Sequence, residues 1–228
     1  SNCEFTYLDI SPKRGYLGME QCGVLPLFHG ISMHDCWASY WSYEDCQHAV
    51  CCAHLLRELT GIAENHPEQK WASAFIGLLI KMKKVKDKAV EAGKETLSYY
   101  HYHKFAKKYD ELIEQARKEN PLPETAEKKR GRKKKGKILA LVERLANYKV
   151  PVCLFIHNFN VPFDNNQAER DLRMIKVKTK VSGCFRTEEG ARDYRKIMSY
   201  VGTAHKQGHN AYQAIKNAIS GHPDFIFE

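Results

Sequence analysis

The first quarter of the chain alternates short apolar runs with turn residues, which is typical of strands and short helices joined by tight turns. Residues 4–9 are β-prone and precede a Ser-Pro turn, and residues 16–22 predict a short helix. Two apolar runs, at 30–34 and 48–53, predict strands, and apolar residues at helical spacing predict a helix over 55–63. This order of elements indicates the beginning of an α/β fold.

Residues 67–150 change to helical periodicity almost throughout. Three apolar stripes at helical spacing predict three core-facing helices: Trp71, Phe75, Leu78, Leu79 and Met82; Phe105, Tyr109, Leu112 and Ile113; and Ile138, Leu141, Val142 and Leu145. Pro121 and Pro123 mark a break between helices. Because a block of this length exceeds an ordinary connection, we interpret it as an insertion or subdomain.

The last third of the chain predicts further helices. Residues 152–159 fit one or two helical turns, although a strand is an alternative. Asp164, with Gln167 three positions later, indicates a capping box at the start of the next helix. Residues 176–181 alternate basic and apolar side chains, which favours extended chain, and Gly183 ends this segment. Two more helices are predicted, over residues 190–207 and 211–219.

Positive charge is clustered along the chain, whose formal net charge is +9. Residues 127–137 form one basic tract, and Lys176, Lys178 and Lys180 form a second cluster. Clustered lysine and arginine favour a polyanionic partner, while a solvated tract that binds nothing specific is the alternative. No apolar stretch approaches the roughly 20 residues needed to cross a bilayer, and the first residues do not resemble a signal peptide. We therefore expect no membrane partner.

The eight cysteines are irregularly spaced and include no Cys-x-x-Cys pair. Several lie in apolar runs, such as Cys153 between Val152 and Leu154, where a reduced cysteine behaves as a small hydrophobic residue. Because reduced thiols are usual inside the cell, this pattern predicts a cytoplasmic protein.

Two acidic residues, Asp35 and Glu169, are candidate metal-binding residues. Asp35 follows the predicted strand at 30–34, a place from which a side chain emerges into a cleft. Glu169 lies on the helix after Asp164 and shares a flank with Arg173 and Lys176. A carboxylate among cations suits a hard metal ion beside a phosphate-rich substrate. The alternative is a surface pair between Glu169 and Arg173, which stabilises a helix by only a few tenths of a kcal/mol.

The segment that contains Glu169 reads Asp-Asn-Asn-Gln-Ala-Glu-Arg-Asp-Leu-Arg over residues 164–173. It resembles the signature of transposases of the insertion sequence 66 family, which has two Asn (here Asn165 and Asn166), a variable residue, Ala-Glu-Arg, and then Leu-Arg. Three further landmarks of that family follow the same order: residues 30–35 with Tyr40; residues 47–54 with Leu56 and Arg57; and Gly183, Gly190, Ala191 and the helix at 200–204. The resemblance covers nearly the whole chain apart from the helical block.

The resemblance implies an α/β fold, a ribonuclease H-like catalytic core interrupted by a mostly helical insertion. Residues 1–66 would form the first part of the core, residues 67–150 the insertion with the basic tract, and residues 151–228 the second part with the catalytic helix. The family uses an Asp-Asp-Glu triad that holds two magnesium or manganese ions for phosphoryl transfer on DNA. By position, Asp35 corresponds to the second acid and Glu169 to the third.

One part of the family pattern is missing. The first Asp of the triad should lie on a strand before residues 4–9, and Asp9 stands at the wrong end of that segment for the role. We therefore expect that the first strand and the first catalytic Asp lie outside these residues. The expectation is that the 228 residues alone neither bind metal tightly nor cut DNA.

The resemblance also implies DNA partners, namely transposon ends and target DNA, and allows self-association in a transposition complex. Six basic residues near Glu169 are predicted to border a DNA-binding groove: Arg170, Arg173, Lys176, Lys178, Lys180 and Arg186. For Arg170 and Arg173, the alternative is that they only pair with Asp171 and Glu169. Trp and Tyr residues at 37, 40, 41 and 43 could stack on bases, but their density favours packing in the core.

Cys51 and His54 resemble a motif that follows the second Asp in related transposases. A zinc site needs about four ligands, and only His48 is an obvious third, so we favour a structural role for His54 near the active site.

Two other functions remain open at this point. A nuclease with the same fold could cut DNA without joining strands. A non-enzymatic, basic DNA-binding or assembly module could carry Asp35 and Glu169 only as surface acids. In that case the two carboxylates would lie far apart.

Overall fold

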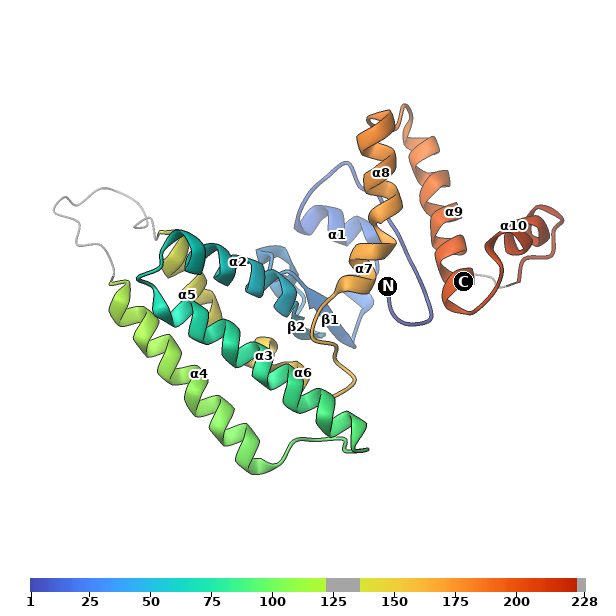
Figure 1. Cartoon of the computed structure of the whole chain (residues 1–228). Coiled ribbons are helices and arrows are strands. Elements are labelled where there is room, and N and C mark those ends of the chain that lie inside the picture. Colours follow the sequence, from blue (N-terminus) through green and yellow to red (C-terminus); the bar gives the residue numbers. More distant parts are fainter. Residues whose placement is uncertain (122–135, 225–228) are drawn as a thin grey trace, which may run out of the picture. The chain divides into compact units, whose positions relative to one another are not determined.

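The computed structural model describes residues 1–121 and 136–224, which form two compact units (Figure 1). We call Ser1–Phe28 with Asn165–Glu228 the terminal unit, and His29–Asp164 the central unit. Most of the predicted basic tract, residues 127–135, lies outside the described residues.

The central unit contains a two-stranded parallel sheet. Strand β1 (Ile31–His34) pairs with β2 (Gln47–Val50), in a register that sets Ile31 opposite Gln47 and His34 opposite Val50. A short 3₁₀ helix, η2 (Ala38–Ser42), lies in the connection. Both strands predicted from the sequence are confirmed.

Among the described residues of the central unit, five helices accompany the sheet: α2 (Cys52–Asn65), α3 (Lys70–Glu91), α4 (Tyr99–Glu119), α5 (Lys137–Asn147) and α6 (Lys149–His157). Helices α2, α3, α4 and α5 pack in chain order, each against the next, and α6 packs on β2. The side-by-side arrangement of α2, α3 and α4 is visible in Figure 1. The ambiguous residues 152–159 are mainly helical, so the strand alternative there is wrong.

One hydrophobic core joins these helices to the sheet. The side chains of Trp71, Phe75 and Tyr109 are fully buried, and the rings of Phe75 and Tyr109 meet edge to face with centroids 4.8 Å apart. The Tyr109 hydroxyl donates to the carbonyl of Leu145 over 2.9 Å, and Lys86 Nζ donates to the carbonyl of Val161 over 2.6 Å. The three predicted apolar stripes are thus confirmed as core, except that Ile138 is only partly buried.

The described residues are mostly helical, with the small parallel sheet as their only strands. A ribonuclease H-like core and its division at residues 66 and 150 remain predictions. None of the described helices has an apolar stretch long enough to cross a membrane.

The terminal unit is built from helices at both ends of the chain: α1 (Tyr16–Cys22), the 3₁₀ helix η1 (Leu25–Leu27), α7 (Asn166–Asp171), α8 (Arg173–Ser182), α9 (Glu188–Lys206) and α10 (Ala211–Ile219). Helices α9 and α10 pack together. The predicted helices at 16–22, 190–207 and 211–219 are confirmed.

The segment at residues 4–9, predicted to be a strand, lies extended along α9 and pairs with no strand of the described residues. Thr6 N–H donates to Thr203 Oγ1 over 3.0 Å, and that hydroxyl donates to the Thr6 carbonyl over 3.3 Å. Leu8 N–H donates to Ser199 Oγ over 2.9 Å. Helix side chains therefore satisfy backbone groups that a neighbouring strand would otherwise pair.

Gly202 permits this close packing. A Cβ atom on Gly202 would lie 2.9 Å from Thr6 Cβ, closer than real Cβ contacts. We expect Gly202→Ala to lower the free energy of unfolding by about 1–3 kcal/mol, because overpacking moves the N-terminal segment off α9. Gly77→Ala is the matched control: Gly77 lies inside α3 with open space around it, so Ala should stabilise by about 0.5–1 kcal/mol. Urea unfolding measures both, and a stabilising Gly202→Ala would contradict this packing.

Two sequence predictions near Glu169 are wrong. Helix α7 begins at Asn166, so Asn165 rather than Asp164 occupies the cap position, and Gln167 Nε2 donates to Asp171 Oδ1 over 3.0 Å instead of closing a capping box. Residues 176–181 belong to helix α8 rather than to an extended segment. Lysine and methionine are good helix formers. In addition, the Lys178 side chain of α8 packs on the rings of Phe185 and Tyr194, and this tertiary packing accompanies the helix.

Candidate functional site

The carboxylate of Asp35 is exposed immediately after β1. Its Oδ1 accepts a hydrogen bond from Trp37 N–H over 3.1 Å, while Cys36 N–H donates to His34 Nδ1 over 3.1 Å. Cys36 has a φ of 70°, a left-handed conformation that is uncommon for a residue with a side chain. Two side chains thus fix the sharp turn that carries Asp35.

A pair of histidines lies behind this turn. His34 Nε2 lies 3.1 Å from His48 Nδ1, and His48 Nε2 lies 2.9 Å from the carbonyl oxygen of Tyr43. Because His34 Nδ1 accepts from Cys36, the His34 proton is on Nε2, which donates to His48 Nδ1. His48 then carries its own proton on Nε2 and donates to Tyr43. Both imidazoles are neutral in this arrangement.

Aromatic rings enclose His34, which is only 2% exposed. The Tyr40 ring stacks on His34 with centroids 4.4 Å apart, and Trp41 meets it edge-on at 4.9 Å. The predicted core role is confirmed for Tyr43, which is buried, and is wrong for Trp37, which is 42% exposed.

Burial and, to a smaller extent, the neighbouring His48 together lower the pKa of His34 to about 4, while Asp35 opposes the shift. The neutral form should therefore persist as the pH falls well below 6.5, the usual value for histidine. Nitrogen-15 NMR should show protonated Nε2 and unprotonated Nδ1 on His34 down to about pH 4. A midpoint near 6.5 would contradict the hydrogen-bond order given above.

Glu169 lies in α7 and is half-buried, and its N–H donates to the Asn165 carbonyl over 3.2 Å. The apolar stripe expected to bury this helix is only partly correct: Ala168 and Ile175 are half-buried, whereas Leu172 is 40% exposed.

The nearby carboxylate of Asp171 forms a largely buried ion pair. Its Oδ2 lies 2.7 Å from Lys206 Nζ, and the two side chains are only 10% and 7% exposed. Burial alone would raise the pKa of Asp171, but hydrogen bonds from Lys206, Ser1 and Gln167 outweigh it, and the pKa is lowered. Sequence reasoning missed this pair because Lys206 lies 35 positions away on a different helix.

The predicted DNA-binding residues lie on α7, α8 and the following turn. Arg170 donates to Gln167 Oε1 over 2.9 Å, whereas Arg173, Lys176 and Lys180 are exposed. The last three are spaced three and four residues apart, so they share one face of the helix. We call these three residues the basic face of α8.

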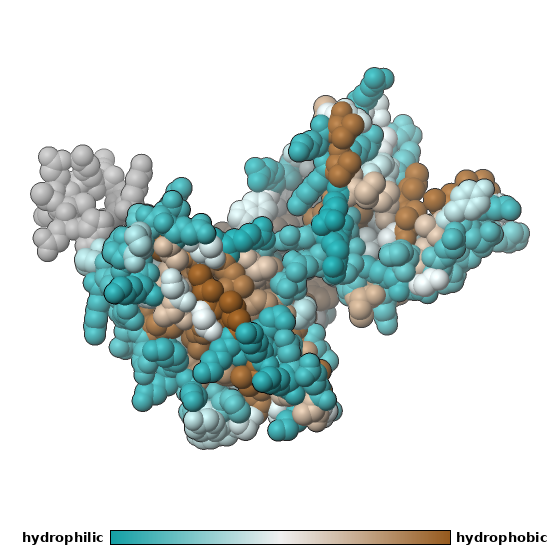
Figure 2. Space-filling view, in the orientation of Figure 1, coloured by the Kyte–Doolittle hydropathy of each residue, from teal (hydrophilic) through white to brown (hydrophobic). Residues whose placement is uncertain are grey.

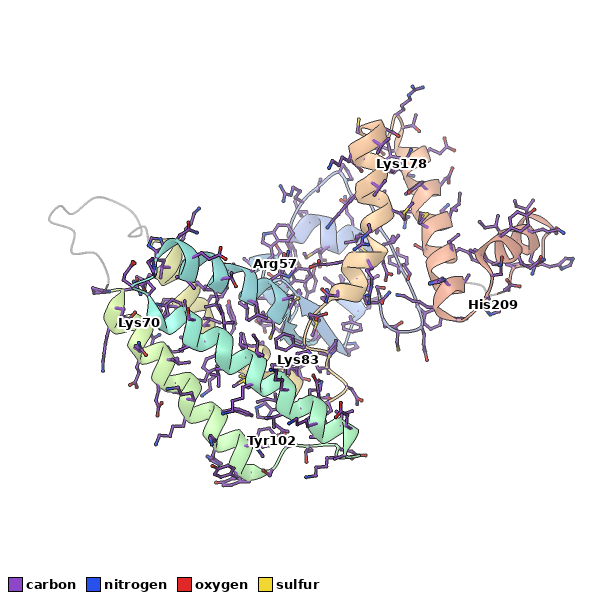
Figure 3. The ribbon with its side chains drawn as sticks, in the orientation of Figure 1. Arg57, Lys70, Lys83, Tyr102, Lys178 and His209 are labelled. Carbon is purple, nitrogen blue, oxygen red and sulfur yellow. The ribbon has the colours of Figure 1, made fainter. Side chains whose placement is uncertain are left out.

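Lys178 has a different environment from the basic face. Its Nζ lies 5.2 Å from the centroid of the Phe185 ring and 5.6 Å from that of Tyr194, so it packs toward α9 (Figure 3). Next to the basic face, α8 exposes three apolar side chains, those of Met174, Val177 and Val181. Figure 2 shows hydrophobic surface over this helix.

Arg186 lines an open groove of about 620 Å³ within the terminal unit, together with Arg192 and Arg195. Arg195 Nη1 lies 2.9 Å from Asp9 Oδ1, and Arg192 pairs with Glu188 over 3.2 Å. Arg192 and Arg195 therefore lie in the same groove as Arg186, which alone of the three was selected from the sequence. Asp9, which looked unsuited to the triad, is instead ion-paired.

A family model described as Transposase IS66 family matches residues 1–193 of the chain. The chain belongs to this family. The resemblance predicted from four landmarks is thus confirmed, and the match includes both Asp35 and Glu169. No curated protein and no solved structure matches the chain.

In this IS66-family transposase, Asp35 lies in the central unit and Glu169 in the terminal unit. Within residues 1–121 and 136–224, no three His, Cys, Asp or Glu side chains form a group that could hold a metal ion. Cys51 is buried at the start of α2, and His54 N–H donates to its carbonyl over 3.2 Å. His48, the third zinc ligand considered from sequence, is engaged with His34 and Tyr43.

Proposed function

We propose that this transposase chain is a catalytic-domain portion that cuts transposon ends and joins them to target DNA by metal-dependent phosphoryl transfer. The observation that carries the proposal is the family match over residues 1–193, which spans both candidate acids. The turn after β1 supports it, because the Trp37 N–H holds the exposed carboxylate of Asp35, and a second hydrogen bond, from Cys36 N–H to His34, fixes the turn that carries it.

Asp35 and Glu169 would hold magnesium or manganese, since carboxylate oxygens are the ligands that these hard cations prefer. When bound, such ions activate water or a DNA 3′-hydroxyl and stabilise the leaving oxygen. The two carboxylates fit this chemistry, and the Asp-Asp-Glu triad expected for the family requires a third. The chain alone should therefore be inactive, and activity should be measured in the full-length transposase.

The basic face of α8 would bind the DNA backbone beside Glu169. Arg173, Lys176 and Lys180 are exposed along one side of the helix, and cations arranged in this way pair with successive phosphates. Lys178 would contribute less, because its ammonium group lies over two aromatic rings.

A strand-transfer assay tests the proposal directly. Labelled transposon ends, uncut in one series and pre-cut in another, are mixed with full-length transposase and a target plasmid, in magnesium or in chelator. We expect joined products in magnesium and none in chelator. Cleavage without joining would favour the nuclease, and binding without either reaction would favour the non-enzymatic module.

A further inference from the structure

The end of the hairpin formed by α3 and α4 carries much of the positive charge of the chain. Residues 81–108, here called the hairpin end, contain nine lysines and three acidic residues. Their net charge of +6 compares with +9 for the whole chain. The function proposed above assigns no role to this charge, although like charges gathered on one surface repel each other unless a polyanion neutralises them.

Three lysines on α3 form an exposed stripe. Lys81, Lys84 and Lys88 are spaced three and four residues apart, so they share one face, and no ion pair of the described residues involves them. At about 1.5 Å per residue the stripe is roughly 10 Å long, so it can lie along more than one phosphate of a nucleic-acid strand. By contrast, Lys83 is paired with Asp87 over 2.7 Å.

Two exposed tyrosines begin α4, the second helix of the hairpin. Tyr99 is 78% exposed and Tyr100 is 65% exposed, although both are large and partly apolar. The His103 ring packs against Tyr99 with centroids 3.9 Å apart, and Lys104 Nζ donates to the Tyr100 hydroxyl over 3.2 Å. Partners one helical turn away thus hold both rings in place while leaving most of their surface open.

Tyr102 anchors this end of the hairpin to the rest of the central unit. Its hydroxyl donates to the Ile156 carbonyl over 2.8 Å, and its ring stacks on His157 with centroids 4.7 Å apart. In Figure 3, Tyr102 lies near the start of α4, whereas Lys70 marks the opposite end of the hairpin. The lysines and tyrosines are therefore displayed on a supported scaffold.

We propose that the hairpin end is a second DNA-binding surface, in which Lys81, Lys84 and Lys88 contact phosphates and the Tyr99 and Tyr100 rings stack on unpaired bases. Regularly spaced cations together with open aromatic rings fit single-stranded nucleic acid better than an acidic protein, which offers no bases for stacking. The ligand is a transposon end with a single-stranded overhang. The inference rests on the proposed function in that it takes DNA as the substrate.

The lysine stripe is tested by the salt dependence of binding. Dissociation constants of full-length transposase for a labelled overhang-bearing end are measured over a series of salt concentrations. Each lost phosphate contact should reduce the slope of log K against log salt by about 0.7–0.9, so Lys84→Gln/Lys88→Gln should reduce it by about 1.4–1.8. The control Lys70→Gln/Lys118→Gln removes the same charge at the other end of the hairpin and should leave the slope unchanged.

The tyrosines are tested by comparing overhang-bearing and blunt ends. Tyr99→Ala/Tyr100→Ala should weaken binding of the overhang about tenfold or more and leave the blunt duplex within about twofold. Tyr212→Ala is the control, because Tyr212 is 76% exposed on α10 in the other unit. Circular dichroism confirms that each variant is folded.

An unchanged salt slope for the lysine variant, or equal losses on both DNA forms for the tyrosine variant, would overturn the inference. If the wild-type protein failed to bind any transposon end, that result would instead contradict the proposed function. The two failures are therefore distinguishable.

Discussion

Glu169→Gln in the full-length transposase should lower strand transfer by about a thousandfold or more, while its affinity for transposon ends stays within about twofold. The amide preserves the size of the side chain but removes the negative charge that a divalent cation requires. Asp35→Asn should have the same effect, because both carboxylates are proposed to serve the same ions.

The control for Glu169 is Glu189→Gln, which makes the same chemical change at an exposed acid in the first turn of α9. It should leave both strand transfer and binding unchanged. If Glu169→Gln instead lost DNA affinity and strand transfer to the same extent, the non-enzymatic binding module would be the better description.

Lys206→Met should lower the free energy of unfolding of the terminal unit by about 3–5 kcal/mol, measured by urea unfolding at neutral pH. The substitution leaves the carboxylate of Asp171 buried without its cation. It also removes hydrogen bonds from Lys206 Nζ to the carbonyls of Asn2 and Phe5, which are 2.8 and 3.1 Å long. Lys196→Met, at an exposed lysine of the same helix, is the control and should change stability by less than about 0.5 kcal/mol.

The pH dependence provides a second test of the Asp171–Lys206 pair. The pKa of Asp171 is lowered in the folded protein, so its stabilisation is fully present above the unfolded value near 4 and is lost as the pH falls through the folded value. The loss of unfolding free energy in Lys206→Met, relative to the wild type, should shrink as the pH falls, because protonation of Asp171 removes its uncompensated charge. If this loss of unfolding free energy were the same at pH 7 and pH 3, lost packing rather than the lost ion pair would account for it.

Helices with a clear apolar stripe could be predicted from the sequence, because burial of one face dominates their stability. This explains the success at α3, α4 and α5, where Trp71, Tyr109 and Leu145 are fully buried. The segment at residues 4–9 was mistaken for a strand because its hydrogen-bond partners are hydroxyl groups of a distant helix. No local pattern reveals such partners.

The two candidate acids of the site could be predicted from the sequence, but their surroundings could not. A family motif selected Asp35 and Glu169, but the histidine pair behind Asp35 depends on the register of β1 with β2, which sets Ser32 opposite His48 and so brings His34 near it. The alternating residues 176–181 favoured extended chain, yet packing of Lys178 on Phe185 and Tyr194 accompanies a helix. Tertiary contacts decided both cases.

Iron-directed cleavage tests most directly whether Asp35 and Glu169 serve the same metal ions. Iron(II) replaces magnesium in the full-length transposase bound to a transposon end, and hydroxyl radicals generated with ascorbate and peroxide cut the nearby backbone. We expect cuts beside both Asp35 and Glu169, and the loss of both sets of cuts in either Asp35→Asn or Glu169→Gln. Cuts beside one residue only, or cuts that survive both substitutions, would contradict a shared metal site.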